Sequence, residues 1–162
     1  MNNENLVYSH TAYFNILKTR GMQGLQKNMP LWKFKLSEEE YEALKQTLRC
    51  HTSDLARYGE EAALCYAEWW RRDYRGTIPS KEDVAMGIGL HRRLGDDLYM
   101  AARKALQKHG YVFLHSSKGT EYFRTLLNQG GLPVNYIKNS GNIGYFSKFL
   151  KELVSELSSI NL

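Results

Sequence analysis

One stretch of the sequence restricts the fold more than any other. Residues 62–67 read Ala-Ala-Leu-Cys-Tyr-Ala, and they lie in the middle of a segment, residues 53–75, that has a helical pattern and ends at Gly76. A helix that is apolar on nearly every side is normally covered by its neighbours on every side. The sequence therefore predicts a domain built around one central helix.

The end of this predicted helix interleaves aromatic and arginine side chains. Two apolar stripes on one helix indicate that it packs on two sides, so we expect the aromatic residues in the core: Tyr66, Trp69, Trp70 and Tyr74. Glu68 is spaced to pair with arginines three and four residues later. We expect the arginine head groups to be exposed, because positive charge is favoured at a helix C-terminus. They are Arg71, Arg72 and Arg75.

Six further segments show helical periodicity or helix start signals. The clearest start is Ser37 followed by Glu40, a capping box with an acidic first turn. Ser80 followed by Asp83 gives a similar signal, and Gly130-Gly131 follows the fifth segment. The predicted helices span residues 3–19, 37–49, 80–87, 96–110, 120–130 and 143–157.

Two short segments have the pattern of strands. Trp32, Phe34 and Leu36 alternate with lysines, and residues 111–114 read Tyr-Val-Phe-Leu. The predicted fold is therefore mainly α: a single helical domain of six or seven helices with a minor two-stranded β element. It covers residues 1–162, with an N-terminal helix and loop over 1–30 and a core over 31–158.

Composition excludes several classes of protein. A chain of 162 residues forms one domain of ordinary size. Two cysteines cannot make a disulfide framework or a four-ligand zinc site, and no apolar run is long enough to span a membrane. With free thiols and no secretory signal at the start, we expect a cytoplasmic protein.

No pattern of catalytic or metal-ligating residues is present in the sequence. None of the five histidines has the spacing of a metal motif, and no Gly-x-Ser-x-Gly sequence occurs. We therefore predict no enzyme, no cofactor and no metal site.

Charge is unevenly distributed along the chain, although the net charge is only +5. Residues 1–36 and residues 118–151 each hold five basic residues against one acidic residue, whereas residues 37–61 hold three against seven. Two basic regions thus flank an acidic one, and they permit contact with nucleic acid or an acidic protein. Besides the three arginines, the candidate contact residues are Lys118, Lys148 and Lys151.

The segment Ser116-Ser-Lys-Gly-Thr120 follows a predicted strand and precedes a predicted helix. Free backbone N–H groups at such a position can bind an anion, here at Gly119 and Thr120. The alternative, which we favour, is a polar turn in which Thr120 caps the helix.

Three features taken together resemble a known group of proteins. They are residues 30–41, the double-tryptophan stretch 66–76, and Gly119-Thr-Glu-Tyr-Phe123 leading to Gly130-Gly-Leu-Pro133. Their order resembles the N-terminal region of very large bacterial genomic-island proteins of a Druantia-like phage-defence system, over about residues 30–155. Because such proteins continue for hundreds of residues, the chain is expected to be a fragment or a stand-alone relative. The resemblance implies a phage-defence setting and transfers no catalytic residue.

Two functional hypotheses follow from the sequence. The first is a non-enzymatic interaction or scaffold module of an anti-phage defence-type protein, which docks a larger assembly. Its partner would be another protein or the remainder of a larger chain, with the arginines facing that partner. The alternative is a nucleic-acid-binding domain that uses the same arginines and lysines, with aromatic rings available for stacking on bases.

Overall fold

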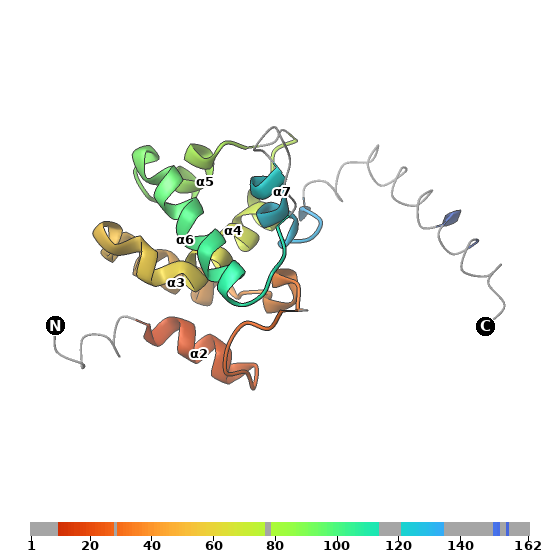
Figure 1. Cartoon of the computed structure of the whole chain (residues 1–162), viewed down its shortest axis with the longest axis horizontal. Coiled ribbons are helices and arrows are strands. Elements are labelled where there is room, and N and C mark those ends of the chain that lie inside the picture. The colour runs from red at the N-terminus through yellow and green to blue at the C-terminus, as the bar shows by residue number, and fades with distance from the viewer. Residues whose placement is uncertain are drawn as a thin grey trace.

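The computed structural model describes residues 10–27, 29–76, 79–113, 121–134, 151–152 and 155. Within these ranges the chain is mainly helical (Figure 1). The α-helices are α2 (Thr11–Thr19), α3 (Glu38–Cys50), α4 (Gly59–Asp73), α5 (Lys81–Ile88), α6 (Gly95–Lys108) and α7 (Glu121–Asn128). The 3-10 helices are η1 (Leu31–Phe34), η2 (Thr52–Tyr58) and η3 (Arg92–Leu94).

Helix α4 is the central element of the fold, which confirms the prediction from its apolar middle. Every residue from Glu61 to Trp69 is buried. Its neighbours are α3, α5, α6, α7, η1 and η2. Figure 1 shows α4 in the middle of the molecule with α3, α5, α6 and α7 around it.

The long helix predicted over residues 53–75 is interrupted, and this part of the prediction is wrong. Residues Thr52–Tyr58 form a 3-10 helix that contains a non-helical residue, Asp54, and α4 begins only at Gly59. A Cβ at Gly59 would lie 2.5 Å from the carbonyl oxygen of Ala101 and 2.6 Å from the Cβ of Ala105. The backbone of α6 therefore passes so close that only glycine fits at this position.

The predicted helix starts at Ser37 and Ser80 are confirmed. The Ser37 hydroxyl accepts a hydrogen bond from the Glu40 N–H (3.1 Å), and the Glu40 carboxylate accepts one from the Ser37 N–H (3.0 Å). Ser80 and Asp83 form the same reciprocal pair at the start of α5. Helix α5 continues through Gly87, its predicted end, and stops instead at Gly89, where φ is +92°.

The predicted two-stranded β element is wrong for the residues that the structure describes. Residues 31–34 form η1, and residues 111–113 have no regular structure, while Leu114 lies outside the described residues. A 3-10 helix repeats every three residues, so Leu31 and Phe34 share the buried side. Trp32 consequently faces outward, although the alternating pattern had placed it on the same side as Phe34.

The two ends of the chain are described only in part. In the first predicted helix, residues Thr11–Thr19 are helical; Tyr13 and Leu17 are buried, but Phe14 is exposed, contrary to the predicted stripe. In the last predicted helix, only residues 151, 152 and 155 are described, and they are helical and exposed. The division into residues 1–30 and 31–158 stays a prediction.

None of the helices described is both long and apolar enough to cross a bilayer.

Candidate functional site

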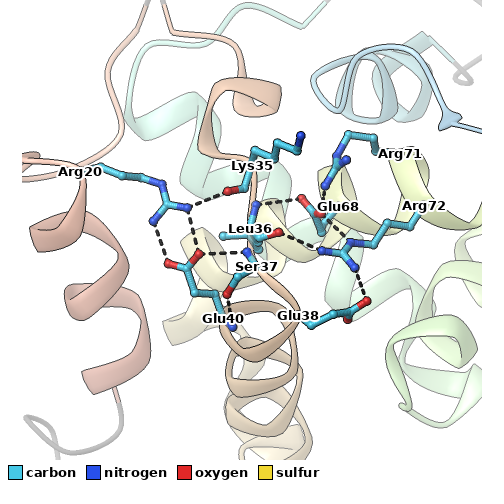
Figure 2. A network of polar contacts seen from close by, with 9 residues as sticks. All are labelled: Arg20, Lys35, Leu36, Ser37, Glu38, Glu40, Glu68, Arg71 and Arg72. Carbon is cyan, nitrogen blue, oxygen red and sulfur yellow. Dashed lines mark hydrogen bonds and ion pairs between the residues drawn. The ribbon is translucent and has the colours of Figure 1, made fainter.

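The carboxylate of Glu68, near the end of α4, is buried and receives three donors (Figure 2). Its Oε1 accepts hydrogen bonds from Arg71 Nη2 and from Arg72 Nε, the latter at 2.6 Å. Its Oε2 accepts the backbone N–H of Leu36 at 3.3 Å. The spacing of three and four residues predicted both arginine pairs.

Arg72 also joins α4 to the start of α3. Its Nη1 donates to Glu38 (2.5 Å) and its Nη2 donates to the Leu36 carbonyl oxygen (2.8 Å). The guanidinium lies 5.2 Å from the centroid of the Tyr41 ring. All three nitrogens of Arg72 therefore donate within the domain, and its charge is largely compensated there.

Arg20 holds the other side of the same loop. It donates to both carboxylate oxygens of Glu40, at 2.7 and 3.0 Å, and to the carbonyl oxygen of Lys35 at 2.7 Å. The hydrogen bond from Arg20 lowers the pKa of Glu40. As Figure 2 shows, the loop between η1 and α3 lies between Arg20 on one side and Arg72 on the other. This charged cluster fastens α2, α3 and α4 together.

The other predicted contact residues lie in different places. Arg75 is 68 % exposed and its Nη2 is 3.7 Å from the Asp73 carboxylate. Lys151 is exposed. Lys118, Gly119, Thr120 and Lys148 lie outside the described residues, so both hypotheses for the 116–120 segment stay open.

The predicted aromatic core divides into two pairs. Tyr66 and Trp69 are buried, and the Trp69 indole packs against Gly87 of α5. Trp70 and Tyr74 are only half-buried, with ring centroids 4.5 Å apart. Trp70 Nε1 donates to the carbonyl oxygen of Gly131 at 2.9 Å, which ties the end of α4 to the end of α7.

Sequence reasoning missed an apolar surface at this end of the molecule. Trp32 is 49 % exposed, Leu132 is 44 % exposed and Val112 is 75 % exposed; we call these three residues the exit surface. The Trp32 N–H donates to the carbonyl oxygen of Gln129 at 2.7 Å, and the Trp32 side chain packs against Gly131. The spacing of three residues between Leu31 and Phe34 is the sequence signal that would have predicted an exposed Trp32.

A shallow cleft adjoins the exit surface. It has a volume of about 290 Å³, and Val112 and Gln129 are among its lining residues. The rest of the lining consists of Lys27, Met29, Pro30, Gly110 and Tyr111. The Nζ of Lys33 lies 5.8 Å from the centroid of the Trp32 ring. The exit surface therefore combines apolar side chains with a lysine rim.

The described histidines make contacts within the domain. His10 Nδ1 lies 2.6 Å from the buried carboxylate of Glu61, and His109 Nε2 lies 3.1 Å from Glu60. His51 Nδ1 lies 2.7 Å from the Thr47 carbonyl oxygen, and His91 accepts the Arg93 N–H. Among the residues that the structure covers, no three His, Cys, Asp or Glu side chains are grouped so that they could hold a metal ion.

Comparison with known proteins places the chain in a family. The family model for the YjiT N-terminal domain matches residues 4–132. No curated protein and no solved structure matches the chain. The matched region thus ends at Leu132, which belongs to the exit surface.

Proposed function

Because the chain belongs to the YjiT N-terminal domain family, we propose that it is a non-enzymatic interaction module whose exit surface docks against the remainder of a larger chain. One observation carries this proposal. Trp32 and Leu132 are exposed beside the point where the matched region ends, and Val112 is exposed at the cleft that Gln129 also lines. Whatever follows an N-terminal domain starts beside this surface.

The chemistry of the exit surface fits a protein partner. Burying a side chain the size of tryptophan or leucine contributes about 1.5–3 kcal/mol, and tryptophan is enriched among the residues that dominate interface energy. The lysine rim favours acidic residues around the apolar centre of the partner surface. The arginines of α4 support docking at the exit surface rather than at the end of α4. Arg71 and Arg72 are ion-paired with Glu68 inside the domain.

The phage-defence setting is part of the proposal. It is supported by the order of the three sequence features, which resembles the N-terminal region of Druantia-like proteins. In that setting the module would join the N-terminal end of a large protein to its assembly.

The experiment follows Trp32 by fluorine NMR after labelling with 5-fluorotryptophan. Trp32→Phe identifies the Trp32 signal, and the buried Trp69 serves as the internal control. We expect the Trp32 signal to show a solvent isotope shift in residues 1–162 alone and to lose it in a longer protein of the family. A Trp32 signal that stays equally solvent-exposed in the longer protein would remove the support for docking in the same chain.

A second candidate function is binding of single-stranded nucleic acid, favoured by the exposed Trp32 ring beside Lys33. An aromatic ring among lysines can stack on a base while the cations contact phosphates. Gel shifts at about 50 mM salt, where phosphate contacts are strongest, test this function. Binding that weakens in Trp32→Leu and Lys33→Glu supports it, and absence of any shift for the parent rejects it.

A further inference from the structure

A second hollow lies between η2 and α6 and reaches α2 at one end. Its larger part has a volume of about 490 Å³ and its smaller part about 320 Å³. Ala56 and Lys104 line both parts, so the two form one groove. Lys108 lines only the larger part and Asp97 only the smaller part. The groove therefore follows α6 over about 16 Å.

The groove combines small side chains with two larger apolar ones. Ala56 lines it from η2, whereas Ala101 and Ala105 line it from α6. Phe14 lies in the larger part and Met100 in the smaller part, and both are exposed. The alanines let a second backbone approach closely, and the two larger side chains offer it apolar contacts.

The two ends of the groove carry opposite charge. Lys104 and Lys108 are exposed one helical turn apart on α6, about 6 Å along its axis, so they point to the same side. Neither lysine forms an ion pair within the part of the chain that the structure describes. Asp97, at the other end, is exposed as well.

Arg57 and the other two carboxylates of the groove have partners inside the domain. Arg57 Nη1 lies 3.2 Å from the carboxylate of Asp54. The carboxylate of Glu60 lies 3.1 Å from His109 Nε2. The charges that remain for a ligand are therefore the two lysines near α2 and the aspartate at the far end.

We propose that this groove binds an acidic amphipathic helix of another protein. A helix that lies along α6 has the same pitch, so two carboxylates one turn apart on it would pair with Lys104 and Lys108. Apolar residues on the same face would contact Phe14 and Met100, as in other complexes of a helix in a groove. The end of the helix that lacks acidic residues would lie near Asp97.

A second copy of this chain is a poorer match for the groove than another protein. The acidic helix of this chain is α3, and three of its four glutamates are already paired within the domain. Glu38 pairs with an arginine of α4, Glu40 with an arginine that follows α2, and Glu42 with a lysine and an arginine of α3. Its carboxylates are therefore not available for the lysines of a neighbouring molecule.

A designed peptide tests the proposal on residues 1–162. The peptide is a stapled helix of about three turns with a leucine face and two glutamates one turn apart near one end. Fluorescence anisotropy at about 50 mM salt, where charge pairs are weakly screened, measures its Kd. We expect it to bind at least about tenfold more tightly than the same peptide with lysine in place of both glutamates.

Charge reversal locates the binding site of the peptide. Lys104→Glu with Lys108→Glu should weaken the glutamate peptide at least about tenfold and should strengthen the lysine peptide. Lys33→Glu with Lys35→Glu makes the same change in net charge at exposed positions outside the groove, and it should leave both Kd values unchanged. An equal loss in the two double variants, or a loss in the Lys33 and Lys35 variant alone, would overturn the proposal.

A steric pair of variants adds a test that does not alter charge. Ala56→Gln fills the groove from an exposed position and should weaken the glutamate peptide at least about tenfold, whereas Ala43→Gln, at an exposed alanine of α3, should not. Thermal melts report that each variant stays folded. The proposal is overturned if the parent binds neither peptide or both equally. It is also overturned if sedimentation shows that the parent self-associates and that the Lys104 and Lys108 variant does not.

Discussion

At the scale of single residues, two buried carboxylates on α4 determine how the domain uses its charge. Glu68 and Glu61 are both buried, and a buried carboxylate is costly unless it is paired and hydrogen-bonded. Glu68 meets this requirement with two arginines and a backbone N–H. Glu61 Oε1 lies 2.6 Å from His10 Nδ1, whereas its Oε2 has no hydrogen-bond partner among the residues that the structure describes. The two residues therefore lead to different predictions.

Removing Arg72 should destabilise the domain strongly. Arg72→Ala leaves Glu68 with one cation and deprives the Leu36 carbonyl oxygen and Glu38 of a donor. We expect the free energy of unfolding to fall by about 3 kcal/mol, as for a broken buried ion pair. Arg75→Ala is the matched control and should change it by less than about 0.5 kcal/mol. Urea melts measure both, and equal effects would contradict a structural role for Arg72.

Glu61 should make stability fall as pH rises. Burial raises the pKa of Glu61, and the hydrogen bond with His10 opposes this shift only in part. Above about pH 4.3 the unfolded chain releases a proton that the folded state still holds. The free energy of unfolding therefore decreases as pH rises from there through the folded pKa.

The variant Glu61→Gln removes this titration. The stability of the parent relative to Glu61→Gln should therefore be greatest below the pH at which unfolded glutamate titrates and should decline as pH rises through the folded pKa. Urea melts across this range measure the difference, with Glu39→Gln, at an exposed position of α3, as the control for loss of one negative charge. A difference that grows with pH would show that the sign is wrong.

At the scale of the elements, close contacts between backbones fix the arrangement around α4. The backbone of α6 contacts Gly59 closely, and the backbone of α4 contacts Gly130 closely. A Cβ at Gly130 would lie 2.5 Å from the Ala67 carbonyl oxygen. Neither glycine has a positive φ, so their role is steric. The central position of α4 thus depends on glycines at these two contacts as much as on apolar side chains.

Adding one methyl group at the contact between α4 and α6 should be costly. Gly59→Ala forces the two helices apart, and overpacking of this kind costs about 1–3 kcal/mol. Gly24→Ala is the control, because a Cβ there meets nothing within 4 Å. Thermal unfolding should show a lower midpoint for Gly59→Ala alone. An unchanged midpoint would mean that α6 moves aside without loss.

The sequence was informative where local chemistry decides the structure. The central helix follows from residues 62–67, and the starts of α3 and α5 follow from their capping boxes. The break before Gly59 has no signal in the predicted helical pattern, and the close contact of Gly59 with Ala101 joins positions some forty residues apart. The alternation at residues 32–36 fits a strand, whereas the spacing of Leu31 and Phe34 fits the 3-10 helix that residues 31–34 form, and only packing in the folded chain decides between the two.

The candidate site was predicted less well than the fold. Local spacing indicated the pairs of Glu68 with Arg71 and Arg72, but the bonds from Arg72 to Glu38 and Leu36 join distant parts of the chain. Those bonds engage an arginine that the sequence alone placed on a partner surface. Trp32 became a candidate only when the structure showed its exposure.

At the scale of the whole molecule, polar and apolar residues serve separate purposes. The charged cluster of Figure 2 fastens α2, α3 and α4, and it leaves Arg75 as the exposed arginine at the end of α4. The exit surface includes the last residue of the region that the family model matches, and its exposed side chains are Trp32, Leu132 and Val112. We therefore propose that the exit surface binds a partner, whereas the charged cluster stabilises the domain.

The most direct test is photo-crosslinking in cells that produce the intact protein. A benzophenone amino acid is placed at Trp32 or at Leu132, and in the control at Met86 of α5, which is 52 % exposed. We predict protein crosslinks from positions 32 and 132 that survive nuclease treatment, and none from position 86. Equal crosslinking at all three positions, or crosslinks at position 32 to nucleic acid alone, would contradict the exit surface as a protein docking site.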